Sequence, residues 1–312
     1  MNRKAIIEKH SPIIKGIEPN APLSIGNGDF GMSFDFTGLQ TFPEAYKAPL
    51  STQSNWGWHS TDGRGKYSLD DAAMQIYNSA PYPLFPEDKE ESYHWLRMNP
   101  HRLQLGQIGF LFYDRQGKEI SSDKVEPVRQ QLSLWNGKAV SEFLADGVSV
   151  TVETACDPDE DMVTVAVHSP LVTDKRIAVQ LAFPSPHMED RKWENTTQLS
   201  WKTEGHYTEI IEEKVIKRTA DDYSYFVEIT GDAELAAGKE HHILLQPMKE
   251  TFTFTVSFSE QKKMSWIAEI FSADPLPTGN NFGQKAAFYP SQEVKIPEPG
   301  NWNGALFYLN IY

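Results

Sequence analysis

The sequence predicts an all-β protein, a large antiparallel sandwich with few short helices, and three observations lead to this class. Stretches in which apolar and polar residues alternate are frequent, which is typical of strands with one buried face. Short glycine-containing turn sequences separate several of these stretches. Helical periodicity is scarce, and strands do not alternate with helices as they would around a parallel sheet. Many strands joined by short turns are typical of a sandwich.

The middle of the chain gives the clearest strands. Leu132 and Leu134 alternate with polar neighbours, and Asn136-Gly137 then predicts a two-residue hairpin turn. Asp146-Gly147 predicts a second turn of the same kind, so we expect a meander here. Four more strands are expected where apolar residues alternate, over 148–152, 163–167, 177–183 and 252–258.

Other parts of the chain are less regular. Only Leu69 to Tyr77 and Met264 to Phe271 have a helical pattern. Residues 43–102 are rich in Pro, Trp, Tyr and His, which predicts long loops that cross one face of the sheets and carry function. We expect one sandwich domain over residues 1–274 and an irregular tail over 275–312, where Pro, Gly and Asn are frequent.

Composition and charge narrow the range of partners. The 312 residues include 43 acidic and 29 basic ones, so the formal charge of −14 opposes binding to a phosphate backbone and we expect no nucleic-acid partner. No apolar run approaches the roughly 20 residues that span a bilayer, so no membrane partner is expected. Residues 1–20 lack the apolar segment of a signal peptide. We expect a cytoplasmic protein, although a secreted mature form would have the same features.

Two motifs resemble ligand sites but fit turns better. Gly26 to Gly31 matches the G-x-G-x-x-G pattern of dinucleotide sites, which requires a helix to follow. A strand pattern follows instead, so we expect a glycine hairpin or bulge and no cofactor. Asp157 to Asp161 resembles the start of a calcium loop, but Met162 stands at the glycine position. We expect a solvated turn there.

No metal site is predicted either. His241 and His242 are neighbours on an expected strand, so their side chains point to opposite faces. Cys156 is the only cysteine, which excludes an intrachain disulfide and a cysteine-based zinc site. Its expected role is that of a small buried apolar side chain.

The candidate site lies in residues 23–60, where glycine turns, an amide and aromatic residues are concentrated. Trp56, Trp58, His59 and Gln40 combine flat apolar faces with directional hydrogen-bonding groups. A sugar ring needs this mixture, because its C–H faces are apolar and its rim is polar. The two tryptophans either meet a ligand or partner domain or anchor the loop.

A second polar and aromatic cluster precedes the strand expected near Leu103. Its candidate binding residues are Trp95, His101 and Arg102, which could line a site together with the Trp56 to His59 loop. The structural alternative is a turn at Asn99-Pro100 and a salt bridge from Arg102 at a strand end.

These runs resemble the amino-terminal part of six-hairpin glycosidase-like proteins, often labelled glycoside hydrolase family 65-like. The resemblance spans about residues 5–260, and its motifs lie at 23–31, 35–42, 56–60, 99–109, 132–137, 146–150 and 161–167. Gly38-Leu-Gln-Thr-Phe42 and Trp56-Gly-Trp-His59 are its more specific motifs, whereas the Gly-Asn-Gly turn occurs in several glycosidase families. The resemblance implies a galactose-mutarotase-like super-sandwich, followed in the family by an (α/α) barrel that holds the catalytic carboxylates.

That barrel has no counterpart in this sequence, since twelve helices with loops would need roughly 200 further residues. No general acid and base can be carried over, so we assign no catalytic residue and leave open whether the chain is an enzyme. The leading hypothesis is a truncated or separately encoded carbohydrate-associated domain, which helps to shape a sugar site together with an (α/α) barrel domain or chain.

Two alternatives stay open. A stand-alone carbohydrate-binding module would use the same aromatic loop without a barrel. An aldose-epimerase-like enzyme would need a histidine and a carboxylate as acid and base, and His59, His94 and His101 are its candidates.

Overall fold

The computed structural model describes residues 2–61, 63, 65–186, 199, 201, 204–249 and 251–262. Within these residues the chain is all-β, as predicted, with antiparallel strands and short helices. The helix expected at Met264 to Phe271 and the tail expected at 275–312 lie outside the described residues.

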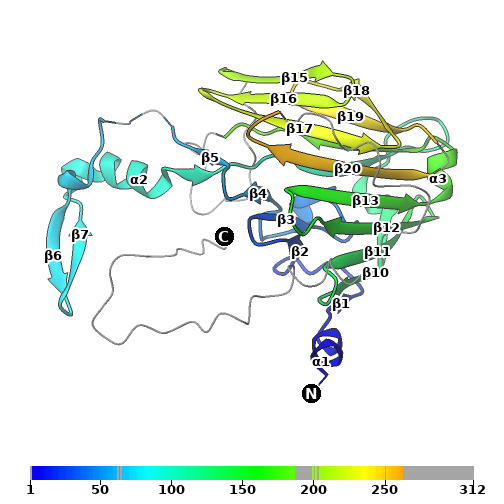
Figure 1. Cartoon of the computed structure of the whole chain (residues 1–312), viewed down its shortest axis with the longest axis horizontal. Helices are drawn as coiled ribbons and strands as arrows, with labels where there is room; N and C mark the ends of the chain where they lie inside the picture. Colours follow the sequence, from blue (N-terminus) through cyan, green and yellow to red (C-terminus); the bar gives the residue numbers. More distant parts are fainter. Residues whose placement is uncertain are drawn as a thin grey trace.

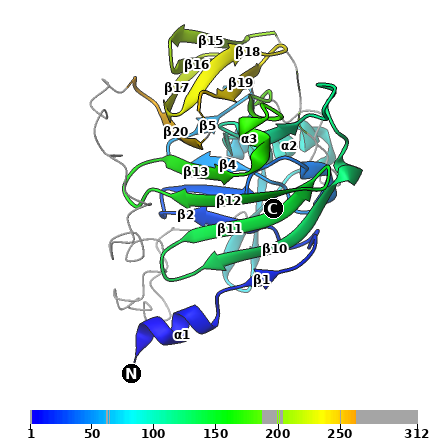
Figure 2. The ribbon, with the colours of Figure 1, turned by 90° about the vertical axis from the view of Figure 1, so that its right-hand side faces the viewer.

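The largest sheet has nine strands in the order β1-β10-β11-β12-β13-β20-β17-β16-β15, and every neighbouring pair is antiparallel (Figure 1). Figure 2 shows β1 and β10 to β13 side by side, with helix α1 beyond β1. The strands are β1 (Ile13–Ile14), β10 (Val125–Ser133), β11 (Lys138–Ala145), β12 (Val148–Cys156), β13 (Met162–His168), β15 (His206–Glu212), β16 (Val215–Ala220), β17 (Tyr223–Gly231) and β20 (Phe252–Ser259). The predicted meander is therefore confirmed.

Four smaller sheets complete the described strands. Their orders are β18-β19-β14-β9, β2-β3-β4, β5-β8 and β6-β7. The bounds are β18 (Ala233–Ala237), β19 (His242–Pro247), β14 (Ile177–Ala182), β9 (Gln107–Phe112), β2 (Leu23–Gly26), β3 (Phe30–Phe34), β4 (Thr52–Ser54), β5 (Trp58–His59), β8 (His101–Arg102), β6 (Ala73–Tyr77) and β7 (Ala80–Leu84).

One apolar core combines side chains of the nine-stranded sheet with side chains of the two smaller sheets β18-β19-β14-β9 and β2-β3-β4. Phe110 and Phe112 of β9 meet Phe143 of β11, with ring centroids 6.3 and 5.8 Å apart. All three rings are buried, and burial of such a side chain contributes about 1.5–3 kcal/mol. Strand β11 alternates buried and half-buried residues along its whole length, so the period of two read from the sequence corresponds to an inner and an outer face.

Of the two hairpin turns predicted from the sequence, one is confirmed and the other is wrong. Asp146 and Gly147 form a two-residue turn between β11 and β12, with φ of 50° and 75°, as expected. The two-residue turn expected at Asn136-Gly137 is wrong, because Ser133 pairs with Lys138 and leaves a four-residue loop. Only Gly137 has a positive φ there, and its N–H donates to the Ser133 carbonyl.

The glycine motif at Gly26 to Gly31 is a hairpin, as predicted, because β2 and β3 pair across it. The Asn27 side chain organises the turn: its Oδ1 accepts from the N–H groups of Asp29 and Phe30 at 3.0 and 2.9 Å.

The described helices are short, and none of the three α-helices was predicted. The α-helices are α1 (Arg3–Lys9), α2 (Glu90–Met98) and α3 (Pro170–Thr173), and the 3₁₀ turns are η1 (Pro43–Ala45), η2 (Leu69–Asp71), η3 (Glu87–Lys89) and η4 (Ser122–Lys124). The helix expected over Leu69 to Tyr77 is wrong. A capping box between Ser68 and Asp71 starts only the short turn η2, and strand β6 follows.

Residues 65–98 form an arm made of η2, β6, β7, η3 and α2, which extends away from the sheets (Figure 1). The long loops expected over 43–102 are therefore replaced in part by regular elements. Trp95 lies on α2 in this arm.

Candidate functional site

The two predicted clusters meet in the smallest sheet. Strand β5 pairs with β8 so that Trp58 lies opposite Arg102 and His59 lies opposite His101. Because neighbouring strand residues point to opposite faces, Trp58 and Arg102 share one face of this ribbon and the two histidines share the other. The structure thus joins four of the seven predicted binding residues in one element, which we call the β5–β8 ribbon.

The outer face of the ribbon is an aromatic and cationic surface. The Arg102 guanidinium lies 4.0 Å from the Trp58 ring centroid, in a cation–π contact. Arg102 also donates to the Ser54 carbonyl at 2.5 Å, and the Trp58 indole N–H donates to the Asn55 carbonyl at 2.9 Å. Trp58 remains 43% exposed, so one large aromatic side chain is fixed in orientation and accessible from solvent.

The inner face of the ribbon is tied to the nine-stranded sheet through a carboxylate. His59 Nε2 lies 2.8 Å from Asp221 Oδ2, and His206 Nε2 lies 3.6 Å from Asp221 Oδ1. Both imidazoles are buried, whereas the Asp221 side chain is 36% exposed. The His59 and His101 rings are in edge contact at 5.2 Å. Sequence reasoning missed His206 and Asp221, since neither lies near the predicted motifs along the chain.

Asp221 is placed by a tight turn. It follows β16 directly, has a φ of 54°, and its N–H donates to the Gly205 carbonyl. Asp is among the few residues that tolerate this conformation. The β16–β17 turn therefore presents its carboxylate to the ribbon.

Trp56 has the properties of an anchor. Its indole N–H donates to Asp161 Oδ2 at 2.5 Å, the same oxygen that accepts from the Ser54 hydroxyl. The ring packs against the core and lies 6.0 Å from the Tyr225 ring. The structure therefore holds Trp56 by its N–H and by one side of its ring.

The turn at Asp157 to Asp161 is not merely solvated, as the sequence led us to expect. Asn27 Nδ2 donates to the carbonyls of Asp157 and Glu160, both at 3.1 Å. Together with the bonds to Asp161, these contacts fix the glycine hairpin and the Trp56 segment to the nine-stranded sheet.

Gln40 and Trp95 lie away from the ribbon surface. The Gln40 side chain is fully buried: its Nε2 donates to the Ser33 carbonyl, and its Oε1 accepts from the Ile108 N–H and the Thr52 hydroxyl. Trp95 packs beside Tyr67 within the arm, with ring centroids 5.8 Å apart.

A buried polar cluster lies next to the histidines. Arg218 is 1% exposed and donates to the Thr208 hydroxyl, the Pro184 carbonyl and His241 Nδ1. Burial lowers the pKa of Arg218 and of His241, and the Arg218 charge lowers that of His241 further. His241 precedes β19 with a φ of 59°, so the expected placement of both histidines on a strand is wrong.

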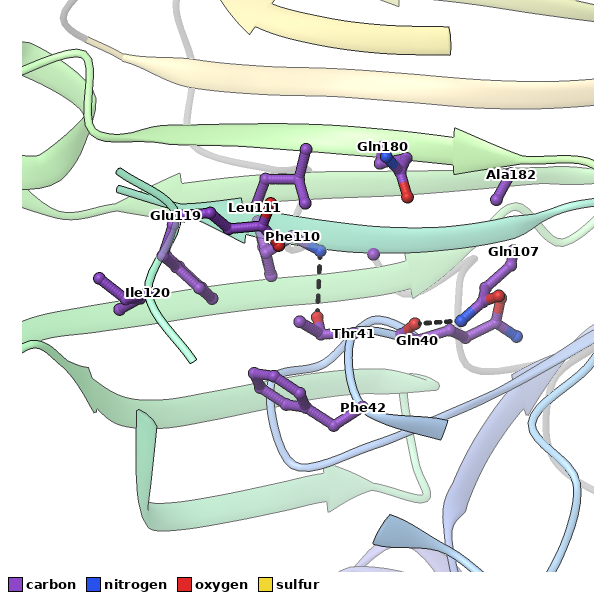
Figure 3. A pocket seen from close by; sticks show the side chains of 12 residues that line it. Gln40, Thr41, Phe42, Gln107, Phe110, Leu111, Glu119, Ile120, Gln180 and Ala182 are labelled. Carbon is purple, nitrogen blue, oxygen red and sulfur yellow. Dashed lines mark hydrogen bonds between the residues drawn. The ribbon is translucent and has the colours of Figure 1, made fainter. Parts of the chain in front are cut away.

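A separate hollow of about 170 Å³ lies between the Gln40–Phe42 loop and the outer side of β9 and β14 (Figure 3). Its wall includes the Thr41 hydroxyl, which accepts from the Phe110 N–H, and Gln107 Nε2, which donates to the Gln40 carbonyl. Gln180 and Glu119 also line it. Gln40 is the only predicted binding residue at this hollow.

The described residues contain no group of three or more His, Cys, Asp and Glu side chains that could hold a metal ion. No helix among them is long and apolar enough to cross a membrane. Cys156 is buried, and burial raises the pKa of its thiol to about 12.

The chain was compared with known proteins. No family model matches it, and no curated protein matches it. Among solved structures, it is similar to a putative kojibiose phosphorylase from human microbiome, at 11% sequence identity and a TM-score of 0.45. The match covers 81% of this chain and 32% of that one, so this chain spans about a third of the matched structure's length. A similarity at this level carries no conclusion about function.

Proposed function

We propose that this chain is the carbohydrate-associated sandwich domain of a glycoside-hydrolase-like protein. In this proposal the domain helps to shape a sugar site, and the catalytic groups are supplied by a helical barrel domain or chain. The observation that carries the proposal is the accessible Trp58 ring, fixed beside Arg102 on the outer face of the β5–β8 ribbon.

The chemistry of this surface supports a saccharide ligand. An indole ring offers an apolar face to sugar C–H groups, and the Arg102 guanidinium offers N–H donors to hydroxyl oxygens beside it. The bonds of Trp58 to Asn55 and of Arg102 to Ser54 reduce the rotamer freedom that binding would otherwise remove. The His59–Asp221 contact supports the ribbon from its inner side.

Trp58→Ala tests this proposal, with binding of mono- and oligosaccharides measured by ligand-observed NMR. We expect weak, about millimolar binding by the wild-type chain, and about tenfold weaker binding by the variant, which corresponds to a loss of about 1.4 kcal/mol on removal of an aromatic anchor. Tyr207→Ala is the matched control, because Tyr207 is an exposed aromatic residue on β15.

Two results would contradict the proposal: a wild-type chain that binds no saccharide, or Trp58→Ala that binds as tightly as wild type. Micromolar binding by the wild-type chain alone would favour the stand-alone binding module instead.

The His59–Asp221 pair favours one second candidate, an aldose-epimerase-like enzyme that needs a histidine and a carboxylate. Mutarotation of glucose and galactose measures this directly. Turnover that is lost in Asp221→Asn would support the enzyme, and the absence of turnover would exclude it for these sugars.

A further inference from the structure

The hairpin β6–β7 lies at the end of the arm (Figure 1). Its sequence is unusually apolar for an exposed element. Residues 72–86 contain no charged side chain, in a chain of which 23% is charged. Met74, Ile76, Tyr77 and Tyr82 are 54, 69, 54 and 56% exposed. A two-stranded hairpin is marginally stable by itself in water and becomes stable with more strands and a covered apolar face.

The two edges of this hairpin differ. Asn78 and Ser79 form a two-residue turn with φ of 49° and 68°, so Tyr77 and Ala80 are a hydrogen-bonded pair. By alternation, the backbone groups of Pro81 and Pro83 point away from β6. Proline has no N–H, so the outer edge of β7 is closed to a further strand.

The outer edge of β6 is open. The N–H and C=O groups of Met74 and Ile76 point away from β7, because these residues pair with the two prolines. Two other edge strands carry charges that oppose strand addition: Glu209 and Glu212 lie on β15, and Glu234 lies on β18. Strand β6 has none.

We propose that β6 pairs with β6 of a second copy of this chain, antiparallel across a twofold axis, to give a four-stranded sheet. An isologous contact requires a self-complementary edge, and β6 meets this requirement. With Gln75 on the axis, Met74 of one copy exchanges backbone hydrogen bonds with Ile76 of the other. The absence of charge removes the repulsion that two acidic edges would create, and the apolar faces of both hairpins become continuous.

Disulfide trapping tests the register. Gln75 would face Gln75 of the second copy as a non-hydrogen-bonded pair, with Cα atoms about 4.5 Å apart, which lies within the range of a disulfide. We therefore expect Gln75→Cys to form a covalent dimer under mild oxidation. Tyr77→Cys is the matched control and should not form a covalent dimer. In the proposed pairing the two Tyr77 positions lie four residues apart along the strands. Cys156 is buried and is present in both variants.

Sedimentation over a wide range of concentration tests the contact without a crosslink. The wild-type chain should approach twice its 35.4 kDa mass. Ile76→Pro should weaken the dimer about tenfold or more, because each copy loses one outward N–H while the hairpin retains its pairing with β7. Met74→Lys, which places charge on the same edge, should act in the same direction. Ile13→Lys on β1, at an edge of the nine-stranded sheet, should leave the dimer unchanged.

Three results would overturn the proposal. These are a wild-type chain that stays monomeric at every concentration, equal crosslinking of the Gln75→Cys and Tyr77→Cys variants, and a dimer that Ile13→Lys disrupts while Ile76→Pro and Met74→Lys do not.

Discussion

Asp35 is a fully buried carboxylate surrounded by hydrogen-bond donors. Its Oδ1 accepts from the Thr37 N–H at 2.7 Å and the Thr37 hydroxyl at 2.6 Å, and its Oδ2 accepts from the Phe42 N–H at 2.6 Å. Burial raises the pKa of Asp35 to about 6, and the hydrogen bonds only partly offset this. Asp35 therefore connects the end of β3 to the Gln40–Phe42 loop.

We predict that the raised pKa of Asp35 makes the free energy of unfolding depend on pH. The folded pKa of about 6 exceeds the ordinary value of 3.8, so the folded state binds the proton more tightly than the unfolded state. The contribution of Asp35 to the free energy of unfolding is greatest below about pH 4. It falls by roughly 3 kcal/mol as the pH rises through 6.

In Asp35→Asn the contribution of this residue to the pH dependence of stability should vanish. The amide N–H₂ faces a backbone N–H donor, which lowers the free energy of unfolding by about 1–3 kcal/mol. The destabilisation relative to wild type should be smaller at neutral pH than near pH 4, as measured by urea unfolding. Asp70→Asn, at a carboxylate in the arm, is the control. Equal destabilisation at both pH values would contradict this account.

At the scale of elements, the free edge of β9 is covered by the Gln40–Phe42 loop. The Ile108 and Phe110 N–H groups donate to Gln40 Oε1 and Thr41 Oγ1, so two side chains act as the acceptors that a neighbouring strand would supply. The loop approaches closely because Gly109 has no side chain. A Cβ at Gly109 would lie 2.9 Å from the Gln40 carbonyl oxygen and 3.1 Å from Thr41 Cα.

Gly109→Ala should therefore displace this loop and lower the free energy of unfolding by about 1–3 kcal/mol, because the crowded atoms belong to the backbone. Amide hydrogen exchange should increase at Ile108 and Phe110. Gly16→Ala is the control, since no atom lies within 4 Å of a Cβ there. An unchanged stability of Gly109→Ala would show that the loop can shift without loss.

The elements that the sequence predicts well are those with local signals. Strands β12, β13, β14 and β20 follow from alternation in the sequence, because apolar residues at every second position of each strand belong to the core. The β5–β8 ribbon has only two residues on each side, too few for a period to be visible. The His59–Asp221 contact joins residues 162 positions apart, and no local pattern encodes such a pair.

Over the whole molecule, the sequence predicted the sandwich but not the arm. The sandwich follows from many alternating segments that share one core, whereas the arm contributes no side chain to that core. Its strand β6 is exposed at all five positions, so burial imposes no alternation on the sequence. The same lack of burial explains why Leu69 to Tyr77 was wrongly predicted to be helical.

The junction between arm and sandwich is closed by hydrogen bonds. The Thr61 N–H and hydroxyl donate to Asn99 Oδ1 at 2.8 and 3.2 Å, just beyond the β5–β8 ribbon. The chain therefore leaves and re-enters the sandwich at one place. An insertion attached in this way should be separable from the domain that carries it.

Replacement of residues 63–97 by a short glycine-rich turn should leave a folded sandwich whose free energy of unfolding differs from wild type by about 1 kcal/mol or less, because no core residue is removed. Denaturant unfolding measures this, and the exposed Trp58 should keep its fluorescence. The same variant should be monomeric in sedimentation. Val152→Ala is a control for sensitivity, since truncation of a fully buried β12 residue should cost about 1–3 kcal/mol in the same assay. A shortened chain that fails to fold would show that the arm stabilises the sandwich through contacts outside the described core.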